Sequence, residues 1–179
     1  MLPRRDPRIK TPLADLQAQA SLQAGAVTGM NQSFDALSQV QSVRAQLKAS
    51  LSKAKGKLAD SLEDLDKQCA ALAGATASNF FGTPPSGKQP ENFSTLNQHF
   101  GQLLAIADSA DSAPTTQASK VYAELAEQLG SLLKHWNDLK RDSVPQLSSE
   151  LRKAGIAEID AGKPLDHDIS GVDDGDDEP

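Results

Sequence analysis

The stretch that decides the fold is LADSLEDLDKQCAAL, at residues 58–72. Its apolar side chains are spaced four, three, four and three residues apart, which is the heptad pattern of a helix packed against other helices. They are Leu58, Leu62, Leu65, Cys69 and Leu72. Charged, amide and small residues fill the other positions. The segment therefore predicts an amphipathic helix, and Gly74 predicts its end.

A much longer helix is predicted ahead of it, over residues 12–52. From Met30 onward apolar residues recur every three or four positions, and Thr11 and Pro12 are typical of a helix start. Gly25 and Gly29 predict a local bend. The lysine-rich turn around residues 52–57 predicts that the helix at 58–72 folds back on the first.

Three more helices are predicted after a Gly- and Pro-rich loop at residues 75–90. A third helix covers residues 93–107, and a fourth begins at or near Pro114 and reaches Leu139. Ser143 or Asp142 is expected to cap a short fifth helix that carries Val144, Leu147 and Leu151 and ends near Gly155. The fold class is thus all-α: an antiparallel up-down helical bundle with one long first helix, three further main helices and a short fifth. The predicted core includes Phe34, Leu37, Leu47, Leu62, Leu65, Phe100, Leu132 and Trp136.

Composition and charge divide the chain of 179 residues into three parts. Residues 1–10 are a Pro- and Arg-rich extended leader, residues 11–159 are the helical bundle domain, and residues 160–179 are an acidic tail predicted to be disordered. Residues 1–57 carry a formal charge of +6, whereas residues 164–179 carry −7. This asymmetry indicates either attraction within the chain or a basic surface for an anionic partner.

Several functional classes are disfavoured by the sequence. One cysteine supplies neither a disulfide nor a cysteine-based metal site, and no apolar run approaches the roughly 18 residues of a membrane span. The first residues do not form a secretory signal peptide. Cys69 lies on the apolar seam, and the carboxylates Asp60, Glu63, Asp64 and Asp66 lie on a solvated face without the burial that acid–base catalysis requires. We therefore expect no enzymatic activity and no cofactor.

Metal binding has only weak candidates. His99 has no ligand type at helical spacing, and His135 has Asp138, which is more typical of a surface ion pair. Asp166, Asp168, Ser170 and Asp177 fall at ligand positions of a calcium loop, with Gly171 at its turn. Asp173 replaces the usual apolar residue of that loop, Asp replaces its final Glu, and Pro164 prevents an entering helix. A plain acidic tail is the favoured interpretation.

Five basic side chains gather near the end of the first helix. No aromatic residue alternates with them and the whole chain has a net charge of −6, so nucleic-acid binding is disfavoured. An anionic protein partner is the alternative that they leave open. They are Arg44, Lys48, Lys53, Lys55 and Lys57.

The chain resembles the C-terminal helical region of bacterial sortilin-like proteins with BNR-type repeats, often labelled glycosyl hydrolases. The similarity covers about residues 6–159. It is carried by DPRIKT (6–11), Leu16 with Gln19, VRAQL (43–47), DSADSAPT (108–115), Trp136 with Leu139, VPQL (144–147), and Leu151 with Ala154 and Gly155. The β-propeller that precedes this region in the family is absent, so no catalytic residue of the family maps onto this chain.

The resemblance implies a non-catalytic structural or protein-interaction module, like a detached C-terminal bundle whose partner is a protein or the missing upstream domain. One alternative is a part of a secreted glycosyl hydrolase, which would place the chain outside the cytoplasm. Another is an adaptor that binds an anionic partner through the basic helix end. Oligomeric state and ligand are not indicated by the sequence.

Overall fold

The computed structural model describes residues 12–74, 91–108 and 113–162, and every regular element within them is a helix. The predicted all-α class with a long first helix is confirmed. The elements are α1 (Leu13–Leu51), α2 (Lys57–Ala73), α3 (Phe93–Asp108), α4 (Thr116–Asp138), the π-helical turn η1 (Leu139–Ser143) and α5 (Val144–Lys153).

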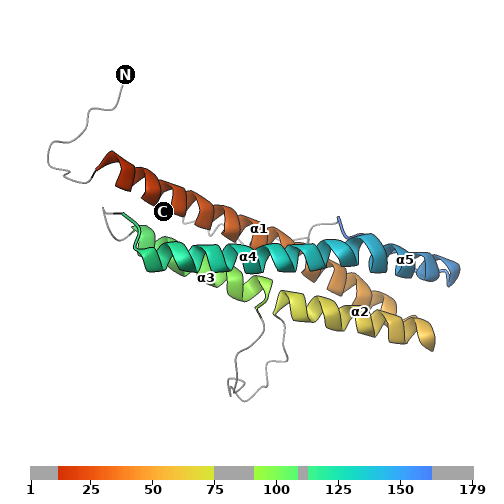
Figure 1. Cartoon of the computed structure of the whole chain (residues 1–179). Coiled ribbons are helices and arrows are strands. Elements are labelled where there is room, and N and C mark those ends of the chain that lie inside the picture. Colours follow the sequence, from red (N-terminus) through yellow and green to blue (C-terminus); the bar gives the residue numbers. More distant parts are fainter. Residues whose placement is uncertain (1–11, 75–90, 109–112, 163–179) are drawn as a thin grey trace, which may run out of the picture.

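These helices pack lengthwise against one another as long rods, and α1 crosses behind α4 in the view of Figure 1. The first rod is α1, the second is α2 followed end to end by α3, and the third is α4 continued through η1 into α5. Arg44 pairs with Asp66 and Gln19 with Ala107, so α2 and α3 run back along α1. Gln39 meets Trp136 near the far end of α4, so the third rod runs in the same direction as α1.

Most of the predicted core lies inside the bundle. Leu47, Leu62, Leu65, Phe100 and Trp136 are buried, and Trp136 retains only 1% of its exposure. The predictions for Leu37 and Leu132 are half right, since both are only partly buried against this core.

The prediction for Phe34 is wrong, because its side chain is 54% exposed. The buried face of α1 instead passes through small residues at this level, namely Ala26, Gly29, Ser33 and Ala36. The periodic large apolar residues of the sequence predicted which side of α1 is buried. The neighbouring helices instead approach the side of α1 on which the side chains are small.

The two glycines of α1 explain why small residues face inward. A Cβ atom on Gly25 would lie 2.5 Å from the hydroxyl oxygen of Tyr122, and one on Gly29 would lie 2.6 Å from the ring of Phe100. Glycine therefore lets α4 and α3 place aromatic rings directly on the α1 backbone. The sequence predicted a bend at these residues, whereas α1 runs through both as one uninterrupted helix.

The predicted cap of a separate fifth helix is also wrong. Ser143 has helical backbone angles and its side chain caps nothing, because the chain never leaves the helix between α4 and α5. Pro145 cannot donate a backbone hydrogen bond, and its ring crowds the carbonyl one turn earlier. The wider turn η1, in which the Val144 amide reaches the Leu139 carbonyl, accommodates this proline without breaking the rod.

Helix ends elsewhere follow ordinary capping chemistry. Pro12, not Thr11, occupies the N-cap of α1, and Thr11 lies outside the described residues. The hydroxyl of Thr115 accepts the amide of Ala118 at 3.1 Å, so α4 begins one to two residues after the expected Pro114. Gly74 ends α2 with a φ of 80°, as its sequence context predicts.

The C-terminal part of the described chain folds back onto the bundle. Ile159 is buried, and its backbone amide and carbonyl both pair with the hydroxyl of Ser148 at 3.2 Å. The amide group of Gln46 on α1 pairs with both backbone groups of Asp160 at 2.8 Å. The packed chain thus extends into the first residues of the predicted tail, while residues 163–179 lie outside the described part.

We expect Trp136→Ala to lower the free energy of unfolding by about 3–5 kcal/mol, because it empties a fully buried site in the core. Phe34→Ala removes a comparable aromatic ring from an exposed site and should cost about 0.5 kcal/mol or less. Urea unfolding followed by far-UV circular dichroism measures both changes. Equal costs for the two variants would contradict the placement of α1 described above.

Gly29→Ala should destabilise the protein by about 1–3 kcal/mol, because the new methyl group would have to displace the Phe100 ring. Gly130 is the matched control, since it lies inside α4 with nothing within 4 Å of its Cβ position. Gly130→Ala should stabilise by about 0.5–1 kcal/mol through helix propensity. Thermal unfolding that shifts in the same direction for both variants would show that no close contact exists at Gly29.

Candidate functional site

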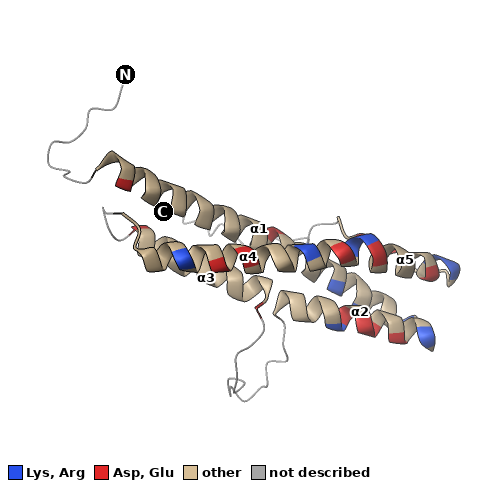
Figure 2. Ribbon diagram, in the orientation of Figure 1, with Lys and Arg blue, Asp and Glu red and all other residues tan. Residues whose placement is uncertain are grey.

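Charge is distributed unevenly along the bundle (Figure 2). Residues 16–34 of α1 and residues 93–107 of α3 contain no Lys, Arg, Asp or Glu. The opposite end, where α2, η1 and α5 lie, carries most of the acidic and basic side chains of the described chain. At the end of the molecule where α3 lies, α1 and α3 therefore present little charge, whereas α4 carries Lys120, Glu124 and Glu127.

The basic side chains predicted near the end of α1 fall into two groups: some lie against α2 and the others are exposed to solvent. The guanidinium of Arg44 pairs with the carboxylate of Asp66 at 2.8 Å, and both side chains are largely covered. Lys48 shares a small hollow with Glu63, Asp66 and Lys67. Lys53, Lys55 and Lys57 remain exposed at the turn between α1 and α2. Arg44 is therefore paired with an acidic neighbour on α2, and Lys48 lies close to the same residue and to Glu63.

The predicted metal candidates are not brought together. His99 Nδ1 lies 3.8 Å from a carboxylate oxygen of Glu91, and Asp138 pairs with Arg141 at 3.0 Å. His135 is exposed. In the described ranges, no three His, Cys, Asp or Glu side chains are grouped as metal ligands would be. The calcium-loop candidates Asp166, Asp168, Ser170 and Asp177 lie outside these ranges.

Cys69 is fully buried on the inner face of α2, as its place on the apolar seam predicts. Burial, and to a smaller extent the nearby carboxylate of Asp66, raise the pKa of its thiol to about 12, against a smaller lowering by the Arg44 guanidinium. A thiol with such a pKa stays protonated at neutral pH. Cys69 is therefore a small apolar core residue and not a nucleophile.

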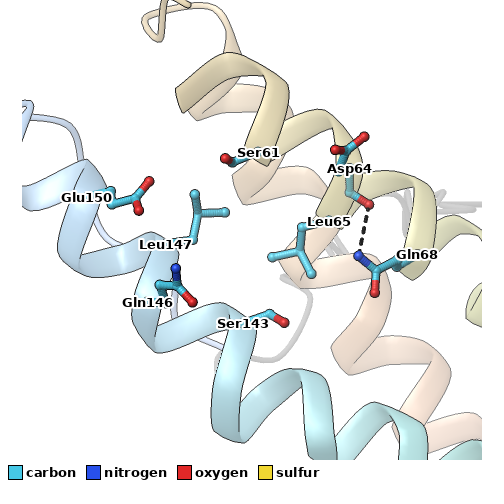
Figure 3. Close-up of a pocket in the computed structure, with 8 residues that line it drawn as sticks. All are labelled: Ser61, Asp64, Leu65, Gln68, Ser143, Gln146, Leu147 and Glu150. Atoms are coloured by element: carbon cyan, nitrogen blue, oxygen red, sulfur yellow. Dashed lines mark hydrogen bonds between the residues drawn. The ribbon is translucent and has the colours of Figure 1, made fainter. Parts of the chain in front are cut away.

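A polar cleft of about 230 Å³ separates α2 from η1 and α5 (Figure 3). Leu65 and Leu147 face each other across its middle, and hydroxyl, amide and carboxyl groups surround them. The carboxylates of Asp64 and Glu150 stand on opposite sides of these leucines. Its lining is Ser61, Asp64, Leu65, Gln68, Ser143, Gln146, Leu147 and Glu150.

The polar groups of this cleft are largely used within their own helices. Ser61 donates its hydroxyl to the Lys57 carbonyl at 3.0 Å, and Gln68 donates to the Asp64 carbonyl at 3.4 Å. The Asp64 carboxylate accepts a hydrogen bond from Lys67 at 3.1 Å. No hydroxyl of this cleft is hydrogen-bonded to a described basic side chain, so the arrangement does not activate a nucleophile.

A different site is a groove between α3 and α4, away from the charged end. Its outer hollow has a volume of about 390 Å³ and is lined mainly by apolar side chains. Ile106, at the α3 side, is 63% exposed. The lining is His99, Gln102, Leu103 and Ile106 from α3, with Thr115, Gln117, Ala118, Val121 and Leu125 from α4 and its cap.

An inner hollow of about 600 Å³ follows along the same groove, toward the middle of the molecule. Glu91, just before α3, and Glu124 and Glu127 from α4 supply three carboxylates, beside Gln128, Ser131 and Leu132. His99 connects the two hollows, because it lines the outer one and approaches Glu91 of the inner one. We call the two hollows together the α3–α4 groove.

Sequence reasoning did not identify this groove as a site. Leu103, Val121 and Leu125 fall within the predicted third and fourth helices, but helical periodicity does not mark a groove between those helices, and the glutamates were not singled out. The signal that could have found it is the absence of charge from residues 93–107, combined with apolar residues at more positions than one packed face of a helix requires.

No described helix is long and apolar enough to cross a bilayer. Comparison with protein-family models, with curated proteins and with solved structures gave no match. The resemblance to sortilin-like BNR-repeat proteins therefore stays a prediction, and function must be argued from the surface itself.

The raised pKa of the Cys69 thiol predicts how the free energy of unfolding changes at alkaline pH. The folded thiol keeps its proton up to a pH of about 12, whereas the unfolded thiol loses it near pH 9. The unfolded state therefore binds fewer protons above pH 9, and the free energy of unfolding falls as pH rises through this window. At pH 10 the loss attributable to Cys69 should be about 1–2 kcal/mol.

The measurement compares urea unfolding of the wild type and Cys69→Ala at pH 7 and pH 10. All other titrating groups are the same in both proteins. The change with pH in the difference between their free energies of unfolding therefore isolates the effect of the thiol. A difference that does not change with pH would show that Cys69 is accessible to water in the folded protein.

Proposed function

We propose that this chain is a non-catalytic helical module that binds a protein partner through the α3–α4 groove. The observation that carries the proposal is the outer hollow, a mainly apolar depression whose lining contains no Lys, Arg, Asp or Glu. Depletion of charged residues with retention of apolar ones is typical of the centre of protein interfaces. A groove between two helices also matches a common mode of helix recognition.

Burial energetics support a partner at this site. Each Å² of apolar surface removed from water contributes about 25 cal/mol, so covering the exposed faces of Ile106, Val121 and their neighbours favours association. The rods that form the groove are held by contacts on their other sides. Phe100 and Tyr122 pack against α1 and against each other, edge to face, at 6.4 Å. A partner would therefore meet a preformed surface, which lowers the entropic cost of binding.

The resemblance adds a specific form of this proposal, in which the module corresponds to the C-terminal bundle of a sortilin-like protein. Its alternative is a part of a secreted glycosyl hydrolase, with the groove contacting the propeller domain of that protein. An adaptor acting through the basic helix end is less well supported, because Asp66 already pairs with Arg44.

Site-specific photo-crosslinking tests the proposal. A photoreactive amino acid at Val121, in the groove, should give discrete adducts with protein in the native cells. The same amino acid at Ser149, an exposed residue of α5 at the charged end, is the matched control and should give none of these adducts. Identical adducts from both positions, or none from Val121, would argue against the groove as a binding surface.

A further inference from the structure

The two ends of the α3–α4 groove differ in chemistry, and this difference restricts what can occupy it. We propose that the occupant is an amphipathic helix of a partner protein whose apolar face continues into a cluster of Lys or Arg. This inference rests on the proposed function and adds the chemistry of the partner. Its apolar face would fill the outer hollow, and its basic end would lie over Glu91, Glu124 and Glu127.

The hollows are aligned as this proposal requires. Along α4, Ala118, Val121 and Leu125 line the outer hollow, and Glu124, Gln128 and Ser131 line the inner one. The distance from Ala118 to Ser131 is about 20 Å at 1.5 Å per residue. A partner helix of three to four turns spans that length, so one segment can contact both hollows.

The three glutamates keep a net negative charge within the described structure. Glu124 faces Lys120 at a long 3.9 Å, and both side chains are largely exposed. Glu91 accepts the hydroxyl of Thr95 at 3.2 Å and has the His99 ring 3.8 Å away. No ion pair joins Glu127 to a cation among the described residues, and the Ser131 hydroxyl donates to the backbone carbonyl of Glu127 at 3.1 Å. Among the described residues, Lys120 beside Glu124 is the one lysine paired with these three carboxylates, which favours a cationic ligand.

The same charges disfavour a second copy of the chain in this groove. A two-fold interface places the same patch on both sides of the contact, so each copy would bring its glutamates to the shared surface. The exposed lysines Lys53, Lys55 and Lys57 lie at the opposite end of the bundle. A basic amphipathic helix meets no such repulsion.

Fluorescence anisotropy with synthetic peptides tests the proposal on the full chain. The probe is a labelled peptide of about 16 residues with Leu at helical i, i+3, i+4 and i+7 spacing and Lys at one end; a second version carries the Lys at the other end. A control peptide carries Glu in place of each Lys. We expect at least one Lys peptide to bind and the Glu peptide to bind at least tenfold more weakly, with the preference reduced at high salt.

Two double variants with the same change in net charge locate the binding. Glu124→Lys/Glu127→Lys reverses the acidic end of the groove and should weaken the Lys peptide about tenfold or more. Asp60→Lys/Glu63→Lys reverses two exposed carboxylates on α2 and should change the affinity by less than about twofold, since exposed charges beyond about 10 Å are screened. Val121→Asp should weaken both Lys and Glu peptides.

The other outcomes separate the inference from the proposed function. Equal binding of Lys and Glu peptides, lost in Val121→Asp, would overturn the basic partner and retain the groove as a binding surface. Binding that Val121→Asp does not affect, or no binding of any peptide, would overturn the inference, and the crosslinking experiment would then decide on the groove independently. A dimer in sedimentation that Val121→Asp dissociates would assign the groove to a second copy. Tighter peptide binding after Arg4, Arg5 and Arg8 are changed to Ser would assign it to the chain's own leader.

Discussion

The bundle depends on the close approach of two aromatic rings to the backbone of α1. Tyr122 from α4 and Phe100 from α3 lie where a Cβ atom on Gly25 or Gly29 would have to be. Helices usually pack with axes 8–10 Å apart, and the smaller side chains at a contact permit the shorter distances. The spacing of all three rods in this half of the molecule therefore follows from two glycines and the small residues beside them.

Side chains on the buried face of α1 and on the helices that contact it are also complementary in size farther along α1. Between Ala26 and Ala36 the buried face of α1 consists of small residues, and its neighbours supply the aromatic ones, whereas Val40, Val43 and Leu47 fill the half that faces α2. Polar atoms in this interface are paired. Asn97 donates to the Met30 carbonyl at 2.8 Å and to the Ser33 hydroxyl at 3.0 Å, and Gln39 accepts from both Trp136 and Lys140 at 3.1 Å. Because such groups are costly to bury unpaired, these contacts also fix the register of the rods.

How much of the helix packing could be predicted from the sequence depended on the size of the side chains on the buried face of each helix. The Leu and Cys heptad of α2 was read correctly, since large residues there occupy the buried positions. On α1 the same reasoning placed Phe34 in the core, because periodicity identifies apolar residues and does not recognise a buried face made of Gly, Ala and Ser. The helix cap predicted at Ser143 is absent for a related reason. A proline usually marks the start of a helix, but here the π-helical turn η1 accommodates Pro145 within a continuous helix. The α3–α4 groove could not be predicted, because seam positions show which faces are apolar and not which of them lack a neighbour.

The arrangement of the rods explains why a groove remains. With α2 and α3 sharing one rod, the described structure supplies two neighbours to each rod and no fourth helix to cover the outer side of α3 and α4 (Figure 1). α3 meets α1 through Asn97, Phe100 and Ala107, while its other side carries His99, Gln102 and Ile106. Leu103 and Leu125 belong to both the core and the groove lining, whereas His99, Gln102 and Ile106 line the groove without being part of the buried core. Changes at these outer residues can therefore alter the surface chemistry of the groove with little effect on the packing against α1.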